Sequence, residues 1–195
     1  MRIGILGGTF DPPHLGHLRL IESALEELEL DEVIVLPANK NPFKKGRAGA
    51  TPQQRMEMVS LLAKQNPKIM VSDMEITRGG LSYTVDTLGE LQMVYPGEYW
   101  FIMGADALKG FGEWKNPQRI LRQCRLAVAA RAPIVQEEVL LGLEDYVKER
   151  VDIIEMPLID ASSTDIRLKV QRGMPIGSLT TPEIVDYIKK NKLYK

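Results

Sequence analysis

Arg2-Ile3-Gly4-Ile5-Leu6-Gly7-Gly8-Thr9-Phe10-Asp11-Pro12-Pro13-His14-Leu15-Gly16-His17 is the stretch that decides the fold. Its first five residues form a short apolar run, typical of a buried strand, and this run leads directly into a pair of glycines. The next periodic segment places four apolar residues on one helical face: Leu18, Ile21, Leu25 and Leu28. A strand, a glycine turn and a helix in this order predict the first unit of an α/β fold.

The same alternation continues along the chain. Further apolar runs predict strands at 32–36, 69–71, 99–103, 126–130 and 151–156. Helices are expected from Pro52, over 83–94, over 136–150, over 163–173 and from Thr181 into the tail. This order predicts a doubly wound parallel sheet in a three-layer α/β/α arrangement that is Rossmann-like, with the aromatic run at 99–103 in its centre. We expect one domain over residues 1–195, with a C-terminal helical portion from about residue 162.

Local signals define the helix that begins at Pro52. Thr51 is expected to cap it, Pro52 suits the first turn, and Gln54 completes a capping box. Met56, Val59 and Leu62 are expected to face inward. In the helix over 83–94 the inward residues are expected to be Val85, Leu88 and Leu91.

Composition excludes several classes of function. The net charge is −1, from 25 basic and 26 acidic residues, so no overall field attracts nucleic acid and any phosphate site has to be built locally. A single cysteine, Cys124, excludes an internal disulfide framework and is expected to be structural. The sequence has no signal-peptide pattern and no apolar run of bilayer length, which favours a cytoplasmic protein without a membrane partner. A homo-oligomer is compatible with the sequence.

The glycine turn carries the clearest chemical signal. Gly7 and Gly8 allow the backbone to approach a phosphate closely, and the following helix start offers amides and positive potential to an anion. His14 and His17, the two histidines of the chain, lie at this helix start, where imidazoles can stabilise charge on phosphoryl oxygens. Neither a dinucleotide G-x-G-x-x-G motif nor a Walker G-x-x-x-x-G-K motif is present, and the histidine pair lacks a third metal ligand. Asp11 is expected to orient or cap the loop.

A second polar segment, Ala161-Ser162-Ser163-Thr164-Asp165-Ile166-Arg167, follows the last predicted strand. Hydroxyls at a helix start cap free amides, and Arg167 lies one turn further on, within reach of a phosphate. Because the carboxyl ends of parallel strands share one edge of the sheet, both polar segments are expected at the same rim.

These two segments together resemble the signatures of the H-x-G-H nucleotidylyltransferase superfamily. Within it, the chain is most similar, over essentially its full length, to the bacterial nicotinate-nucleotide adenylyltransferases. Three further segments carry that resemblance: Arg55-Met56-Glu57-Met58, Gly80-Leu81-Ser82-Tyr83-Thr84-Val85-Asp86-Thr87, and Gly104-Ala105-Asp106-Ala107-Leu108 with Trp114 downstream. The resemblance implies transfer of the adenylyl group of ATP to nicotinate mononucleotide, which gives nicotinate adenine dinucleotide and pyrophosphate in NAD biosynthesis. It also implies Mg²⁺, carried by ATP and without side-chain ligands from the protein.

Carried over by position, the resemblance implies two sets of site residues. Those for ATP are Gly7, Gly8, Thr9, Phe10, His14, His17, Ser162, Ser163 and Arg167, of which His14, His17 and Arg167 are catalytic. Those for the mononucleotide are Lys44, Ser82, Tyr83, Thr84, Gly104, Asp106, Trp114 and Lys115. Asp106 is expected to bind a ribose hydroxyl and Trp114 to stack on the pyridine ring. Backbone amides near Thr84 and Lys115 are expected to receive the nicotinate carboxylate.

One position departs from the family pattern. Relatives often have P-P-H-K after the second strand, whereas this chain has Asn41-Pro42-Phe43-Lys44, so that Phe43 stands in place of the histidine. Three alternatives to the implied function remain open at this point. They are an adenylyltransferase acting on nicotinamide mononucleotide, one acting on phosphopantetheine, and a nucleotide-binding regulator without catalysis.

Overall fold

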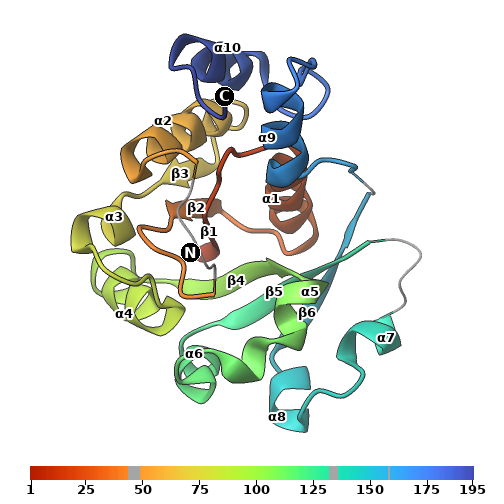
Figure 1. Ribbon diagram of the computed structural model, residues 1–195. Helices are drawn as coiled ribbons and strands as arrows, with labels where there is room; N and C mark the ends of the chain where they lie inside the picture. Colours follow the sequence, from red (N-terminus) through yellow and green to blue (C-terminus); the bar gives the residue numbers. More distant parts are fainter. Residues whose placement is uncertain (44–48, 132–135, 158) are drawn as a thin grey trace.

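A parallel sheet runs through the middle of the molecule (Figure 1). The structure, a computed structural model, describes residues 1–43, 49–131, 136–157 and 159–195. In these ranges six strands pair in the order β3-β2-β1-β4-β5-β6, and every pairing is parallel. Their bounds are β1 Arg2–Gly8, β2 Glu32–Pro37, β3 Ile69–Val71, β4 Glu98–Gly104, β5 Arg125–Arg131 and β6 Val151–Met156. The predicted doubly wound sheet is confirmed, and the aromatic strand β4 lies beside β1 at its centre.

Helices connect the strands. They are α1 Leu15–Glu27, α2 Pro52–Ala63, α3 Met74–Arg78, α4 Thr84–Val94, α5 Ala105–Lys109, the 3-10 turn η1 Phe111–Glu113, α6 Pro117–Gln123, α7 Gln136–Leu140, α8 Asp145–Lys148, α9 Ser163–Gln171 and α10 Pro182–Lys190. Over the described residues, no helix has the length and apolar character needed to cross a membrane.

The two faces of the sheet bury two separate cores because successive side chains of a strand point to opposite faces. Tyr99, Phe101 and Met103 pack with α4 and α6 on one face. Trp100 and Ile102, the residues between them, pack with α1 on the other face. Burial of both faces explains why the strands are continuous apolar runs rather than alternating ones.

A third apolar cluster joins α2 to the C-terminal helices α9 and α10. Met58 and Leu62 of α2 meet Ile166 of α9 and Ile184 of α10 there. Figure 1 shows α9 and α10, in blue, above the carboxyl edge of β1 and close to α1 and α2. This packing brings the end of the chain to the loop that follows β1.

The local signals of α2 are confirmed in part. The Thr51 hydroxyl accepts from the Gln54 amide at 3.2 Å, and the Gln54 side chain accepts from the Thr51 amide at 2.9 Å, which completes the capping box. The inward face includes Val59 and Leu62 as expected. Met56 is half-buried, and Arg55 is the buried residue of that turn, at 1% exposure.

Two expectations about helices need correction. The helix predicted over 136–150 is instead two short helices, α7 and α8. Gly142, at φ 77°, lies between them in a left-handed conformation that ends a helix and that glycine adopts at little cost. The sequence reading also missed α3, α5 and α6, which are short and lack a full period of apolar residues.

Cys124 is structural, as expected. It is a free cysteine at 4% exposure, at the C-terminal end of α6. Burial raises the pKa of its thiol to about 12, so the reactive thiolate is almost absent at neutral pH.

Candidate active site

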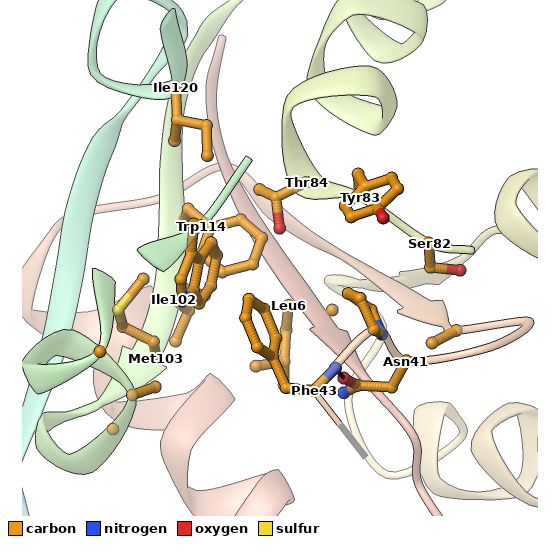
Figure 2. Close-up of a pocket in the computed structure, with 18 of the residues that line it drawn as sticks. Leu6, Asn41, Phe43, Ser82, Tyr83, Thr84, Ile102, Met103, Trp114 and Ile120 are labelled. Carbon is orange, nitrogen blue, oxygen red and sulfur yellow. Dashed lines mark hydrogen bonds between the residues drawn. The ribbon is translucent and has the colours of Figure 1, made fainter. Parts of the chain in front are cut away.

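A cavity of about 620 Å³ opens at the carboxyl ends of β1 and β4. These two strands are neighbours where the strand order changes direction, the position at which open α/β sheets bind ligands. The walls come from the end of β1, the loop after β2, the start of α4, the end of β4 and the segment from α5 to Lys115. Figure 2 shows the side chains of Trp114, Phe43 and Thr84 around one hollow.

The glycines at the end of β1 have different roles. A Cβ atom at Gly8 would lie 2.9 Å from the ring of Phe10, so that ring requires glycine there. Gly7 has only ordinary contact distances around such an atom and lines the cavity with its backbone. Phe10 itself is buried at 2% exposure with a left-handed φ of 51°, which turns the chain sharply after the strand.

The two histidines lie together at the start of α1. The His14 amide donates to His17 Nδ1 at 3.1 Å, and the His17 amide donates to the His14 carbonyl at 2.9 Å. Their ring centroids are 3.7 Å apart. Because Nδ1 of His17 accepts a hydrogen bond, its neutral ring carries the proton on Nε2 and is a hydrogen-bond donor. The ring of His17 lines the cavity.

Gly16 explains the spacing of the two histidines. A Cβ atom there would lie 3.0 Å from Nδ1 of His14, closer than nearly all real contacts of this kind. The absence of a side chain therefore leaves room for the His14 ring to lie over the first turn of α1. In this way the glycine between the histidines serves the packing of an imidazole.

The second polar segment meets the first loop directly. Ser162 caps α9, with its hydroxyl accepting from the Asp165 amide at 3.0 Å. The Ser163 hydroxyl donates to the Pro12 carbonyl at 2.8 Å, and Nη1 of Arg167 donates to the Asp11 carbonyl at 2.8 Å. The expectation that both segments meet at one rim is therefore confirmed. Ser163 and Arg167 use some of their donors for hydrogen bonds to the carbonyls of the first loop.

Part of the cavity wall is aromatic. Trp114 packs edge-on against Phe101, with ring centroids 5.5 Å apart, and lies 5.5 Å from Phe111. Phe43, which is 55% exposed, faces Trp114 at 5.9 Å between centroids with the two planes 34° apart. Trp114 is half-buried and borders the cavity, so a flat ring can lie against it.

Ser82, Tyr83 and Thr84 lead into α4 along the same cavity. The Ser82 hydroxyl accepts from the Asn39 amide at 3.0 Å, which ties this segment to the loop after β2. The first hydrogen bond within α4 runs from the Asp86 amide to the Tyr83 carbonyl, at 3.1 Å. The Thr84 amide, two residues before Asp86, lies at the start of α4 and so at the positive end of the helix dipole, where a carboxylate is stabilised.

Lys115 already has partners. Its Nζ atom donates to Asp86 at 2.8 Å and lies 4.5 Å from the centroid of the Tyr83 ring. The lysine therefore bridges two walls of the cavity, and its charge is balanced by a carboxylate.

Gly104 and Asp106 lie at the end of β4 and border the cavity. A Cβ atom at Gly104 would meet no described atom within 4 Å, so packing within the described protein does not require glycine at this position.

The predicted site residues divide into three groups. Those lining the cavity are Gly7, Gly8, His17, Ser82, Tyr83, Thr84, Gly104, Asp106, Trp114 and Lys115. Those beside it, on the signature loop or α9, are Thr9, Phe10, His14, Ser162, Ser163 and Arg167. Lys44 lies outside the described residues.

Three polar residues border or support the site, and the sequence analysis did not assign them to it. Arg55, fully buried, donates to the Thr9 and Ala38 carbonyls at 2.7 and 2.6 Å. Glu75, 5% exposed, borders the cavity and accepts from the Thr87 hydroxyl at 2.7 Å. Tyr194 donates to Asp11 at 2.8 Å. Of these three residues, only Arg55 could have been found from the sequence, because it lies in the segment Arg55-Met56-Glu57-Met58 that carries the family resemblance.

The donors of the site suit phosphate rather than a bare metal ion. Across the described residues, no group of three or more His, Cys, Asp and Glu side chains is arranged to hold a metal ion. Imidazole, guanidinium and helix-start amides instead offer N–H groups to phosphoryl oxygens.

Comparison with known proteins gives a consistent result. Residues 5–169 match the model of the cytidylyltransferase-like family. A protein of Desulfitobacterium hafniense strain Y51, with the name "Probable nicotinate-nucleotide adenylyltransferase", is 42% identical over 100% of this chain and 96% of the relative. A protein of the same name from Roseiflexus sp. strain RS-1 is 40% identical over 99% of this chain and 98% of its own length.

A solved structure is similar in fold. It is that of Plasmodium falciparum nicotinic acid mononucleotide adenylyltransferase complexed with NaAD, with a TM-score of 0.81 and 20% identity. The similarity covers 99% of this chain and 97% of that one.

Proposed function

Because the chain belongs to the cytidylyltransferase-like family and, within it, to the nicotinate-nucleotide adenylyltransferases, we propose that it transfers the adenylyl group of ATP to nicotinate mononucleotide. The products are nicotinate adenine dinucleotide and pyrophosphate, and the reaction is a step of NAD biosynthesis. The observation that carries the proposal is the cavity at the carboxyl ends of β1 and β4, which is lined by both His17 and Trp114, with His14 stacked beside His17. A phosphate-binding loop and a flat aromatic surface in one cavity suit two nucleotides bound end to end.

The chain's own residues position charge rather than form covalent bonds. The phosphate monoester of the mononucleotide is itself a nucleophile at neutral pH, so the α-phosphorus of ATP needs alignment and charge stabilisation. His17, with its proton on Nε2, donates to a phosphoryl oxygen, and His14 lies against it. Ser162, Ser163 and Arg167 hold the leaving pyrophosphate at the start of α9.

Nucleotidyltransferases that act on ATP generally use a divalent metal ion, and we propose Mg²⁺ here. Mg²⁺ prefers oxygen ligands and keeps several waters, and it is commonly bound through substrate phosphates. Since the described residues include no cluster of side-chain ligands, the ion enters as part of the substrate, MgATP. When bound, it neutralises part of the charge on the phosphates.

The start of α4 supports a preference for the acid over the amide of the pyridine ring. A carboxylate at the Thr84 amide gains from the helix dipole, whereas a neutral carboxamide gains less and brings N–H donors to a site that is already rich in donors. The Lys115 side chain contributes little to this preference because Asp86 balances its charge.

The preference for the acid can be measured with three acceptors. We expect kcat/KM for nicotinate mononucleotide to exceed that for nicotinamide mononucleotide by at least about tenfold, the worth of one hydrogen bond to a charged group. Phosphopantetheine should give no pyrophosphate above background. Pyrophosphate release with MgATP and each acceptor at the same concentrations provides the comparison, and equal kcat/KM values for the two mononucleotides would rule out the carboxylate site.

Replacing Trp114 by alanine tests the stacking surface. The variant should raise KM for nicotinate mononucleotide roughly tenfold, because stacking of a base on an aromatic side chain is worth about 1–3 kcal/mol. KM for ATP should stay within about twofold, since Trp114 packs among Phe43, Phe101 and Phe111 and does not belong to the loop that carries the histidines. Trp114→Phe is the matched control, which keeps a flat ring and should recover most of the affinity. Equal increases of KM for both substrates would contradict stacking on the pyridine.

A further inference from the structure

Tyr194, next to the last residue of the chain, reaches the loop that carries the histidines. Its side chain is 8% exposed, and its hydroxyl donates to Oδ1 of Asp11 at 2.8 Å, across 183 residues of sequence. Its backbone has φ 62°, a left-handed conformation that is costly for a bulky residue and persists only where the surroundings hold it. The packing of the C-terminal segment thus places this hydroxyl against Asp11.

The carboxylate of Asp11 joins three segments of the chain. Besides Tyr194, the Gly49 amide donates to Oδ2 at 2.7 Å and the Ala50 amide donates to Oδ1 at 3.0 Å. Asp11 is 5% exposed, so these three donors replace water around a carboxylate that is almost fully buried. Of the three, Tyr194 supplies the side-chain donor, whereas the two amides belong to the segment that leads into α2.

Tyr194 also packs on the backbone beside Asp11. A Cβ atom at Gly49 would lie 2.8 Å from Cδ1 of the Tyr194 ring, so the ring lies directly on this glycine. Burial raises the pKa of the Tyr194 hydroxyl, and the nearby Asp11 charge raises it further. The hydroxyl therefore keeps its proton and donates over the whole working pH range.

The carbonyls of the same loop are held by other residues. Arg167 binds the Asp11 carbonyl, Ser163 the Pro12 carbonyl, and the Thr180 hydroxyl donates to the Pro13 carbonyl at 3.0 Å. The side chain of Asp11 is thus a separate attachment point of the loop, to which Tyr194 contributes a hydroxyl donor beside the two backbone amides.

We infer that Tyr194 is a positioning residue for adenylyl transfer. Acting through Asp11, its hydroxyl holds the loop that follows Phe10 so that His14 and His17 face the phosphates of ATP. Its kinetic consequence rests on the proposed function, whereas its effect on the two imidazoles does not.

Tyr194→Phe removes the hydroxyl and keeps the ring on Gly49. We expect kcat to fall about tenfold, because a small displacement of catalytic groups has a large effect on rate. KM for ATP and for nicotinate mononucleotide should remain within about twofold. Since His14 and His17 are the two histidines of the chain, the imidazole NMR signals report the loop directly, and both signals should shift.

Tyr187→Phe is the matched control. It also removes a hydroxyl bonded to a carboxylate, that of Glu57 at 2.6 Å, but on the outer side of α10 and α2. This control should keep wild-type kcat and wild-type histidine signals. Gly49→Ala is a second test, because its added methyl displaces the Tyr194 ring, and it should shift the same two signals.

The possible outcomes distinguish the positioning role of Tyr194 from the proposed adenylyl transfer. If Tyr194→Phe matches Tyr187→Phe in kcat, or lowers kcat while the histidine signals stay in place, Tyr194 does not position the loop and the inference is wrong. If the wild-type protein releases no pyrophosphate with nicotinate mononucleotide, the proposed function fails. The histidine signals of Tyr194→Phe and Gly49→Ala then decide the positioning role by themselves.

Discussion

His17→Ala is expected to lower kcat by about 10²-fold or more while the protein stays folded, because it removes a donor aimed at charge that develops in the transition state. The imidazole lines the cavity, and its accepted hydrogen bond from the His14 amide leaves the proton on Nε2. KM for ATP should change much less than kcat, since other groups also hold the phosphates. Steady-state pyrophosphate release and the far-ultraviolet circular dichroism of the variant test the two expectations.

His17 also caps its own helix, and a second variant separates this role from catalysis. In His17→Gln the side-chain oxygen can accept from the His14 amide, as glutamine does at this position of a capping box, but the imidazole is gone. We expect His17→Gln to regain the thermal stability that His17→Ala loses and to remain as slow as that variant. Recovery of kcat in His17→Gln would show that the cap, and not the imidazole, matters for the rate.

Arg55→Met is expected to lower the free energy of unfolding by roughly 3 kcal/mol, since each buried acceptor left without a donor costs about 1–3 kcal/mol. Arg55 is 1% exposed and serves the carbonyls of Thr9, Ala38 and Asn39, the last at 3.3 Å. Burial lowers the pKa of its guanidinium, and the charge of Asp11 opposes that shift. Removal of Arg55 also leaves the buried carboxylate of Asp11 without this nearby positive charge.

The matched control for Arg55 is Arg19→Met. Arg19 forms an exposed pair with Glu22 on α1 at 3.0 Å, and pairs of this kind contribute about 0–1 kcal/mol. Urea unfolding of both variants gives the comparison, with the loss for Arg55→Met expected to exceed that for Arg19→Met by at least about 2 kcal/mol. Equal losses would mean that the Arg55 hydrogen bonds do not stabilise the loops after β1 and β2.

The strands and the longer helices were predictable because their signals are local. The apolar runs at 99–103 and 151–156, and the capping residues on either side of Pro52, are each contained within a few residues. The single helix predicted over 136–150 was wrong because it ran through Gly142, whose left-handed backbone lies between α7 and α8. Short helices such as α5 were not predicted, because one helical turn holds too few apolar residues to show a period.

The two polar segments and Trp114 were predictable from the sequence, but the residues that hold the site together were not. Arg55 lies 46 residues from Thr9, and Tyr194 lies 183 residues from Asp11. Nothing in the local sequence of either residue indicates such a partner, because the packing of α2, α9 and α10 creates the contact. For Phe43, the sequence alone showed that a phenylalanine stands where relatives often have histidine. The structure adds that its ring faces Trp114.

The most direct test of adenylyl transfer follows the α-phosphate of ATP. The purified protein is incubated with magnesium, nicotinate mononucleotide and ATP labelled at the α-phosphorus, and the products are separated. We predict that the label appears in nicotinate adenine dinucleotide and that one pyrophosphate is released for each dinucleotide formed. Label that stays in ATP, or that appears in AMP without dinucleotide, would contradict the proposed reaction.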